Sequence, residues 1–238
     1  MEATTGAADA LAQHGREVKT LGGARREFLR RRSPWIILTA IAAAAGARVA
    51  LGGIGWGDAI AAAVMLVVYP FGEWAIHVYL LHMKPFSFRG REVQLISARA
   101  HRAHHGDPSN LGLVLLYWWQ VGALLVLAVP LTVAAGGAIA SVIAGGVPWG
   151  PLVTALLTGY ALVLSYEWTH FLIHTAYRPR GSIYKSIWRN HRLHHFKNEH
   201  FWHGVTQNLS DRVLGTNPDQ QEVRRSSTAR TLGSGPTG

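Results

Sequence analysis

The chain has 238 residues, of which 49% are hydrophobic and only 15% are charged. This length is enough for one domain with a sizeable core, and the charge content is well below that of an ordinary soluble protein. The absence of cysteine excludes disulfides, iron–sulfur clusters, thiolate zinc sites and cysteine nucleophiles. The net charge of +10 comes from Lys and Arg grouped beside long apolar runs. This grouping favours a membrane margin over nucleic-acid binding.

The first 33 residues are polar and basic, and they lack the order of segments expected of a signal peptide. We interpret residues 1–33 as a flexible basic cytoplasmic tail. An apolar run follows at 35–51, then a glycine-rich turn, and then a second run at 58–82. The second run becomes polar only near its end. Each run is close to the roughly 20 residues that a helix needs to cross a bilayer.

A polar, basic segment leads to a third apolar run at 111–135, and a fourth spans 151–173. The uncharged, glycine-rich stretch at 135–150 fits either a turn or a re-entrant segment. The two short connections contain no Lys or Arg, whereas the N-terminus, the middle segment and the C-terminal region hold nearly all of them. This distribution predicts four transmembrane helices in two hairpins, with both termini in the cytoplasm.

The expected protein is therefore all-α and polytopic, with a membrane-embedded domain at 34–216. Residues 175–215 are expected to form a helical cytoplasmic cap, and residues 217–238 a disordered tail. The Ala-, Gly- and Arg-rich composition is typical of a GC-rich bacterial genome, which points to the bacterial inner membrane.

Ten of the 13 histidines lie in four clusters. The clusters are His77 and His82; His101, His104 and His105; His170 and His174; and His191, His194 and His195. Residues three or four apart share a helix face, so each HxxHH triplet is expected to converge on one point. The five-residue spacing of the first pair predicts that its helix ends or distorts there. Because burying ten unpartnered imidazoles would be costly, the pattern predicts metal ligation.

Ten ligands exceed the capacity of one ion, so the sequence predicts two. Imidazole suits zinc, copper, iron or nickel, and the ligand type alone does not choose among them. A redox role would exclude zinc as the working metal. Two rival classes place histidines differently. A metal transporter would carry ligands near mid-span, and a haem cytochrome would pair single histidines across helices.

The order HX4H, HX2HH, HX3H, HX2HH resembles the fatty acid hydroxylase and sterol desaturase superfamily. The flanking segments are also similar: EWAIHVYLLH at 73–82, YEWTHFLIH at 166–174 and HRLHHFKNEHFWHGVTQNLSDRVLGT at 191–216. The resemblance covers roughly residues 60–216. The closing segment is most similar to the fatty acid 2-hydroxylase branch, while carotenoid and sterol hydroxylases or desaturases share the histidine skeleton.

The resemblance implies an integral-membrane enzyme with two iron ions, for which zinc can substitute in purified protein. It implies O2-dependent hydroxylation of an unactivated C–H bond in a membrane lipid. Eukaryotic fatty acid 2-hydroxylases often carry a fused cytochrome b5 domain, and we find none in these 238 residues. We therefore expect a separate electron donor of the ferredoxin or cytochrome b5 type.

Residues close to the ligands in the sequence are candidates for a supporting shell around the metal. Carboxylates three or four residues before a ligand can accept hydrogen bonds from imidazoles. The candidates are Glu73, Glu167, Asn198, His200 and His203.

Overall fold

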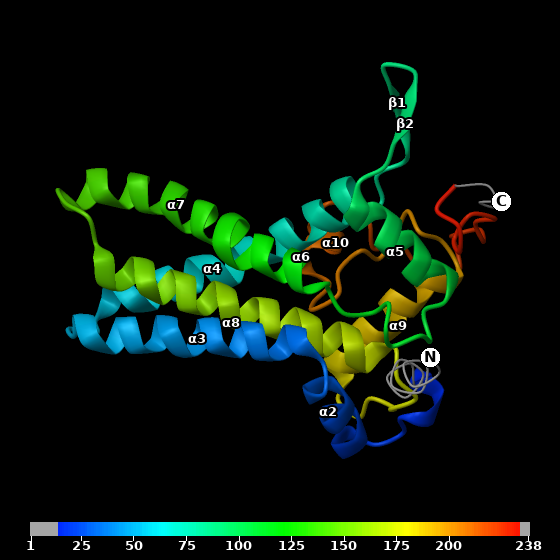
Figure 1. Ribbon diagram of the computed structural model, residues 1–238, viewed down its shortest axis with the longest axis horizontal. Coiled ribbons are helices and arrows are strands. Elements are labelled where there is room, and N and C mark those ends of the chain that lie inside the picture. The colour runs from blue at the N-terminus through cyan, green and yellow to red at the C-terminus, as the bar shows by residue number, and fades with distance from the viewer. Residues whose placement is uncertain (1–13, 234–238) are drawn as a thin grey trace, which may run out of the picture. The chain divides into compact units, whose positions relative to one another are not determined.

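The computed structural model describes residues 14–233, and the ends of both expected tails lie outside the described residues. Within this range the chain forms helices and one short two-stranded hairpin, so the all-α prediction is confirmed (Figure 1). The chain divides into two compact units. The helical unit comprises Phe28–Tyr69 and Leu116–Trp168. The histidine unit comprises the residues up to Glu27, Pro70–Leu115 and the residues from Thr169 onward.

Four helical segments are long and apolar enough to span a membrane. They are α3 (Arg32–Leu51); α4 (Trp56–Ala75) with the π-helix η2 (Ile76–Leu81); α6 (Trp118–Ala123), the π-helix η3 (Leu124–Ala128) and α7 (Val129–Ala144); and α8 (Trp149–Ile173). Large apolar side chains along them are exposed, and Val142 and Ile143 exceed 80% exposure. Such surface suits lipid rather than water.

Two boundaries differ from the sequence prediction. The third span begins at Trp118 rather than at 111, because Leu111 is fully buried in a turn in which the Asn110 side chain accepts a hydrogen bond from Gly112 N. At the other end, α7 runs unbroken to Ala144. The glycine-rich stretch is therefore mostly helix, and no re-entrant segment forms between α7 and α8.

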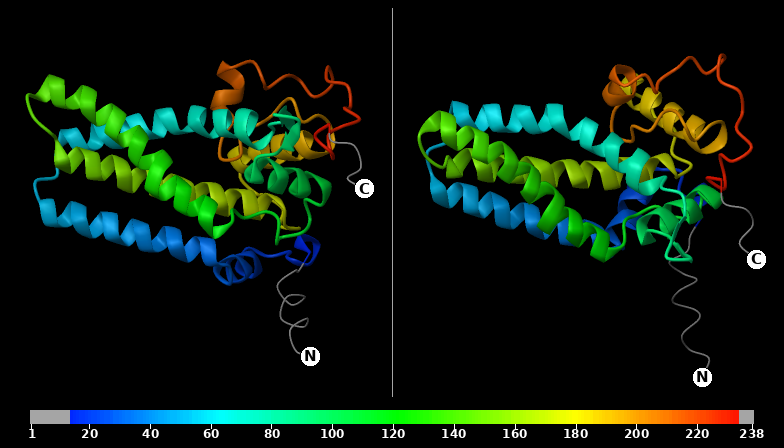
Figure 2. Two further views of the ribbon diagram at one scale, coloured as in Figure 1. Left: turned by 45° about the horizontal axis from the view of Figure 1, so that its top comes forward. Right: turned by 90° about the horizontal axis from the view of Figure 1, so that it is seen from above.

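Apolar contacts among α3, α6, η3, α7 and α8 form the core of the helical unit, where long segments run side by side (Figures 1 and 2). Ile37 and Val121 are completely buried in it. The Tyr160 hydroxyl donates to the Leu125 carbonyl at 2.8 Å. A Cβ at position 159 would lie 2.6 Å from the Val129 side chain, so Gly159 lets α7 and α8 approach closely.

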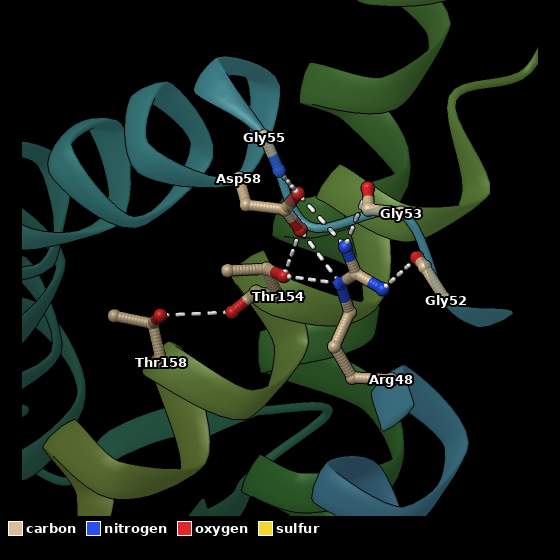
Figure 3. A network of polar contacts seen from close by, with 7 residues as sticks. All are labelled: Arg48, Gly52, Gly53, Gly55, Asp58, Thr154 and Thr158. Atoms are coloured by element: carbon tan, nitrogen blue, oxygen red, sulfur yellow. Dashed lines mark hydrogen bonds and ion pairs between the residues drawn. The ribbon is translucent and has the colours of Figure 1, made fainter. Parts of the chain in front are cut away.

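One end of the helical unit is fastened by a polar network (Figure 3). Arg48 Nε lies 2.6 Å from Asp58 Oδ1, and Arg48 Nη2 donates to Asp58 Oδ2 at 2.8 Å. Thr154 Oγ1 of α8 donates to the same carboxylate at 2.5 Å. Arg48 Nη1 also donates to the carbonyl of Gly52, whose φ of 62° suits glycine. The network ties the α3–α4 turn to α8.

The remaining elements are short. They are the 3-10 turn η1 (Gly15–Glu17), α2 (Leu21–Leu29), the antiparallel strands β1 (Phe86–Phe88) and β2 (Arg91–Val93), α5 (Ile96–Gly106), α9 (Ser182–Phe196) and α10 (Leu209–Val213). The described parts of both expected tails are folded. Gly15 N donates to Ser109 O at 2.7 Å, and Ala229 O accepts a hydrogen bond from His105. The sequence suggested tails there because these stretches are polar.

Candidate metal centre

The ten clustered histidines come from four places in the histidine unit. These are the end of the second span, α5, the end of the fourth span and α9. The predicted distortion after α4 is present as the π-helix η2, in which His82 N donates to His77 O at 3.1 Å. A π-helical turn brings residues five apart onto one face. The His77 and His82 rings accordingly lie 4.9 Å apart.

All ten histidines gather into two groups of five, and in each group one ring nitrogen per residue lies within 4.8 Å of all the others. The first group is His77, His82, His101, His105 and His194. The second group is His104, His170, His174, His191 and His195.

The grouping corrects the expectation that each triplet converges on one point. In α5, His101 and His105 join the first group while His104 joins the second. At about 100° per residue, positions four apart differ by only about 40° around the helix axis, whereas neighbouring positions differ by about 100°. The neighbours His104 and His105 therefore point to different groups.

The same division occurs in α9 with the roles exchanged. His191 and His195 join the second group, while His194 joins the first. Each half of the chain thus supplies four nitrogens to its own group and one to the other. The two groups are adjacent, since the rings of His105 and His195 lie 4.1 Å apart.

The first group has the geometry of nitrogens around a cation. His101 Nε2 lies 3.1 Å from His77 Nε2 and 3.2 Å from His105 Nε2. Two nitrogens at right angles, each about 2.1 Å from one ion, would be roughly 3.0 Å apart. His77 Nδ1 lies 2.6 Å from the carbonyl oxygen of His203, and His105 Nδ1 lies 2.8 Å from that of Ala229.

Because a carbonyl can only accept a hydrogen bond, these contacts place the proton on Nδ1 and leave the Nε2 lone pairs facing inward. His194 is arranged alike, with Nδ1 2.8 Å from Phe201 O. Its buried Nε2 has no hydrogen-bond partner within residues 14–233. Converging lone pairs repel one another, and a cation between them removes the repulsion. The residues therefore fit a metal.

The second group repeats this spacing. His191 Nε2 lies 3.1 Å from His174 Nε2 and 3.0 Å from His195 Nε2. Burial, together with the neighbouring imidazoles, holds the pKa of His104, His191 and His195 well below 6.5. Their rings are therefore neutral, which is the state that binds metal.

A turn at residues 203–206 contacts the first histidine group through the carbonyl of His203. Asp211 accepts hydrogen bonds from His203 N and Gly204 N at 2.9 and 2.7 Å. Glu73 Oε1 accepts from Val205 N and Thr206 N at 2.6 and 3.0 Å. The turn places the His203 carbonyl beside the His77 ring. By holding the turn, the carboxylates of Asp211 and Glu73 therefore orient the candidate ligand His77 indirectly.

The five supporting candidates have different surroundings. Glu73 bonds the turn rather than an imidazole, and Glu167, in the helical unit, accepts from Ser33 Oγ and Leu116 N. The His203 ring packs 5.3 Å from that of His77. The Asn198 side chain accepts from the backbone N–H of His200, whose own side chain is 66% exposed. His203 thus contacts a candidate ligand directly.

The most important supporting groups, the carbonyls of Phe201, His203 and Ala229, were not predicted. A backbone acceptor has no residue-type signal. Gly204–Thr206 and the later Asp211 do lie within the segment at 191–216 that carries the family resemblance. Glycine is required at 204, because a Cβ there would lie 2.0 Å from Gln207 O.

A cavity of about 370 Å³ opens beside the first group. Its walls include the candidate ligand His82 and the neighbouring His203. Apolar surface comes from Trp74, Val78 and Leu232. The cavity thus has apolar side chains and the candidate ligand His82 on the same lining.

Together, four apolar span-length helices and two five-histidine groups define an integral-membrane protein with histidine clusters that could hold metal ions. The chain matches the family described as Fatty acid hydroxylase over residues 62–216. Because this match covers more than half of its length, the chain belongs to that family. The matched range agrees with the 60–216 predicted from the motifs.

Curated relatives are similar over the same part. A dihydroceramide fatty acyl 2-hydroxylase of Arabidopsis thaliana is 27% identical over 153 residues, covering 61% of this chain and 55% of that protein. A second such enzyme from the same plant is 23% identical, covering 67% of this chain and 61% of its own length. The fatty acid 2-hydroxylase of Mus musculus is 28% identical, covering 63% of this chain and 37% of the mouse protein. The chain thus spans about half the length of these relatives. No solved structure matches it.

Proposed function

We propose that this chain is a lipid monooxygenase that hydroxylates an unactivated C–H bond of a fatty acid or acyl lipid. The observation that carries the proposal is the convergence of inward-facing imidazole nitrogens in two adjacent groups. The ten histidines would hold two iron ions. Five nitrogens in each group exceed the four ligands usual for a structural zinc site.

Bound iron would supply O2 activation and the oxidising power to cleave the C–H bond. The balanced reaction consumes the lipid, O2, two electrons and two protons, and it yields the alcohol and water. The two electrons require a donor, which we propose is a separate protein of the ferredoxin or cytochrome b5 type.

The chain's own residues would position the ligands and the substrate. The carbonyls of Phe201, His203 and Ala229 hold three imidazoles in the tautomer that leaves Nε2 free. The cavity beside His82 would admit the reactive part of the lipid. Burial of the histidines keeps bulk water from the centre.

The carbon oxidised is proposed from the relatives. All three are named as 2-hydroxylases acting on fatty acids or fatty acyl groups. We therefore propose the 2-position of an acyl chain, ahead of a carotenoid or sterol substrate. A transporter is disfavoured because the histidines lie at or beyond the ends of the second and fourth spans.

We also propose that the four spans form two hairpins in a bacterial inner membrane, with the histidines in a cytoplasmic cap. The connections at 52–55 and 145–148 contain no Lys or Arg, which supports this orientation. Reporter fusions at those two connections and at the C-terminus would test it. A cytoplasmic signal from either short connection would contradict it.

Comparative lipid mass spectrometry tests the activity, using membranes that contain the wild type or His194→Ala. A lipid class that gains one oxygen only with the wild type would establish hydroxylation and identify the substrate. Loss of two hydrogens would instead establish desaturation. Identical profiles in a host that supplies electrons and varied lipids would refute the proposal.

A further inference from the structure

A second cavity in the histidine unit, of about 400 Å³, lies apart from the turn at 203–206. Its walls include Arg16, Arg178 and Arg192, with His174 on the same lining. The wall from η1 is fixed by the backbone, since Gly15 N donates to Ser109 O at 2.7 Å and Ala176 N donates to Gly15 O at 2.8 Å. Arg16 is therefore held at the cavity rather than on a loose tail.

The charge of this cavity is uncompensated. No Asp or Glu is among the residues that line it. Across residues 14–233, none of the three arginines forms an ion pair with an acidic side chain. All three arginines are exposed to solvent, which leaves their guanidinium groups accessible to an anion that enters the cavity.

Aromatic rings hold two of the guanidinium groups in place. The Arg192 guanidinium lies 4.9 Å from the Trp188 ring centre and 5.2 Å from that of Phe196. Arg178 lies 5.8 Å from the same indole. These cation–π contacts preorganise the donors, which lowers the entropy cost of binding. The indole N–H of Trp188 is itself buried and lacks an acceptor within the described residues.

We propose that this cavity binds a phosphoryl group. Three guanidinium charges are poorly balanced by one carboxylate, whereas a phosphate monoester carries close to two negative charges. Arginine also donates two parallel hydrogen bonds to phosphate oxygens, which suits a rigid, stacked side chain. The phosphoryl group belongs either to the head group of an anionic membrane lipid or to a soluble phosphate compound.

The test uses the full chain in nanodiscs of phosphatidylcholine, with binding of inorganic pyrophosphate measured by calorimetry. We expect saturable binding by the wild type and at least roughly tenfold weaker binding by Arg178→Gln/Arg192→Gln, because two charge-assisted contacts are lost. Arg180→Gln is the matched control, since Arg180 is exposed and does not line the cavity. If the double variant fails to fold, Arg192→Lys replaces it. This variant keeps the positive charge but loses the two parallel hydrogen bonds of the guanidinium, so its affinity for pyrophosphate is expected to be lower than that of the wild type but still measurable.

A second arm identifies the source of the phosphoryl group. If nanodiscs containing phosphatidic acid abolish pyrophosphate binding to the wild type, the site takes a lipid head group. If pyrophosphate still binds with unchanged affinity, the site takes a soluble phosphate compound. The proposal is overturned if the wild type binds neither pyrophosphate nor phosphatidic acid. It is equally overturned if Arg180→Gln weakens binding as much as the double variant, since the effect would then be one of general surface charge.

Discussion

Glu73 provides a sharp test of how the first histidine group is held. Its carboxylate accepts hydrogen bonds from Val205 N, Thr206 N and the Thr206 hydroxyl. The carbonyl of His203, which belongs to the same turn, orients His77. Glu73→Ala removes all three acceptor contacts at once. Glu73→Gln keeps an amide oxygen for the two backbone N–H groups, and the Thr206 hydroxyl can rotate to accept from the amide nitrogen.

The expected cost follows from the groups left without partners. Val205 is 1% exposed, so Glu73→Ala strands one buried backbone N–H and a second that is partly buried. At about 1–3 kcal/mol for a buried unsatisfied group, the loss is about 2–4 kcal/mol. For Glu73→Gln we expect about 1 kcal/mol, because neutral hydrogen bonds replace charged ones while the desolvation cost of a carboxylate disappears.

Two measurements check this reasoning, the free energy of unfolding in detergent and the metal content per chain. Under the proposed function, Glu73→Ala is expected to lower the metal content from two ions toward one, because His77 loses its orienting carbonyl. Glu73→Gln should keep nearly two. Equal losses in the two variants would show that charge, not hydrogen-bond acceptance, matters at this position. A wild-type metal content in Glu73→Ala would refute the link from Glu73 to His77.

Further predictions concern the rest of the chain. His104→Ala and His194→Ala should each lower the metal content by about one ion per chain, from opposite groups; spectra of protein loaded with cobalt would show whether the lost ion differs. Arg48→Met and Asp58→Leu should each lower the melting temperature, whereas the double variant should regain most of the loss, because an unpaired charge is worse than none; strictly additive losses would contradict this. Metal-free protein should lose stability as the pH falls from 6.5 toward 4, since burial lowers the pKa of His203 to about 4 while its ordinary value is 6.5. The unfolded chain alone then takes up the proton, and a flat profile of melting temperature over that range would exclude this contribution.

Much of the architecture was predictable because it depends on long-range composition and on spacing. The four apolar runs gave the spans, and the five-residue gap between His77 and His82 correctly indicated a distorted helix end. The start of the third span was missed, because residues 111–114 form turns in which Leu111 and Val114 are buried, and the helix begins only at Trp118.

The sequence predicted which ten histidines gather at the site, but not how they divide into two groups. Spacing alone put all of His101, His104 and His105 on one broad face. The division depends on where the two centres lie around the helix axis, which is a tertiary property. Likewise, the sequence offered Glu73 and Glu167 as partners for imidazoles, whereas backbone carbonyls take that role for His77, His105 and His194.

The exchange of one histidine between the halves has a consequence for biosynthesis. When the ribosome has made α5, the first group has four of its nitrogens and lacks only that of His194. That residue lies in α9. The same helix carries two of the five nitrogens of the second group, so neither group is complete until α9 has been synthesised and packed. A chain that stops short of α9 therefore lacks ring nitrogens of both groups.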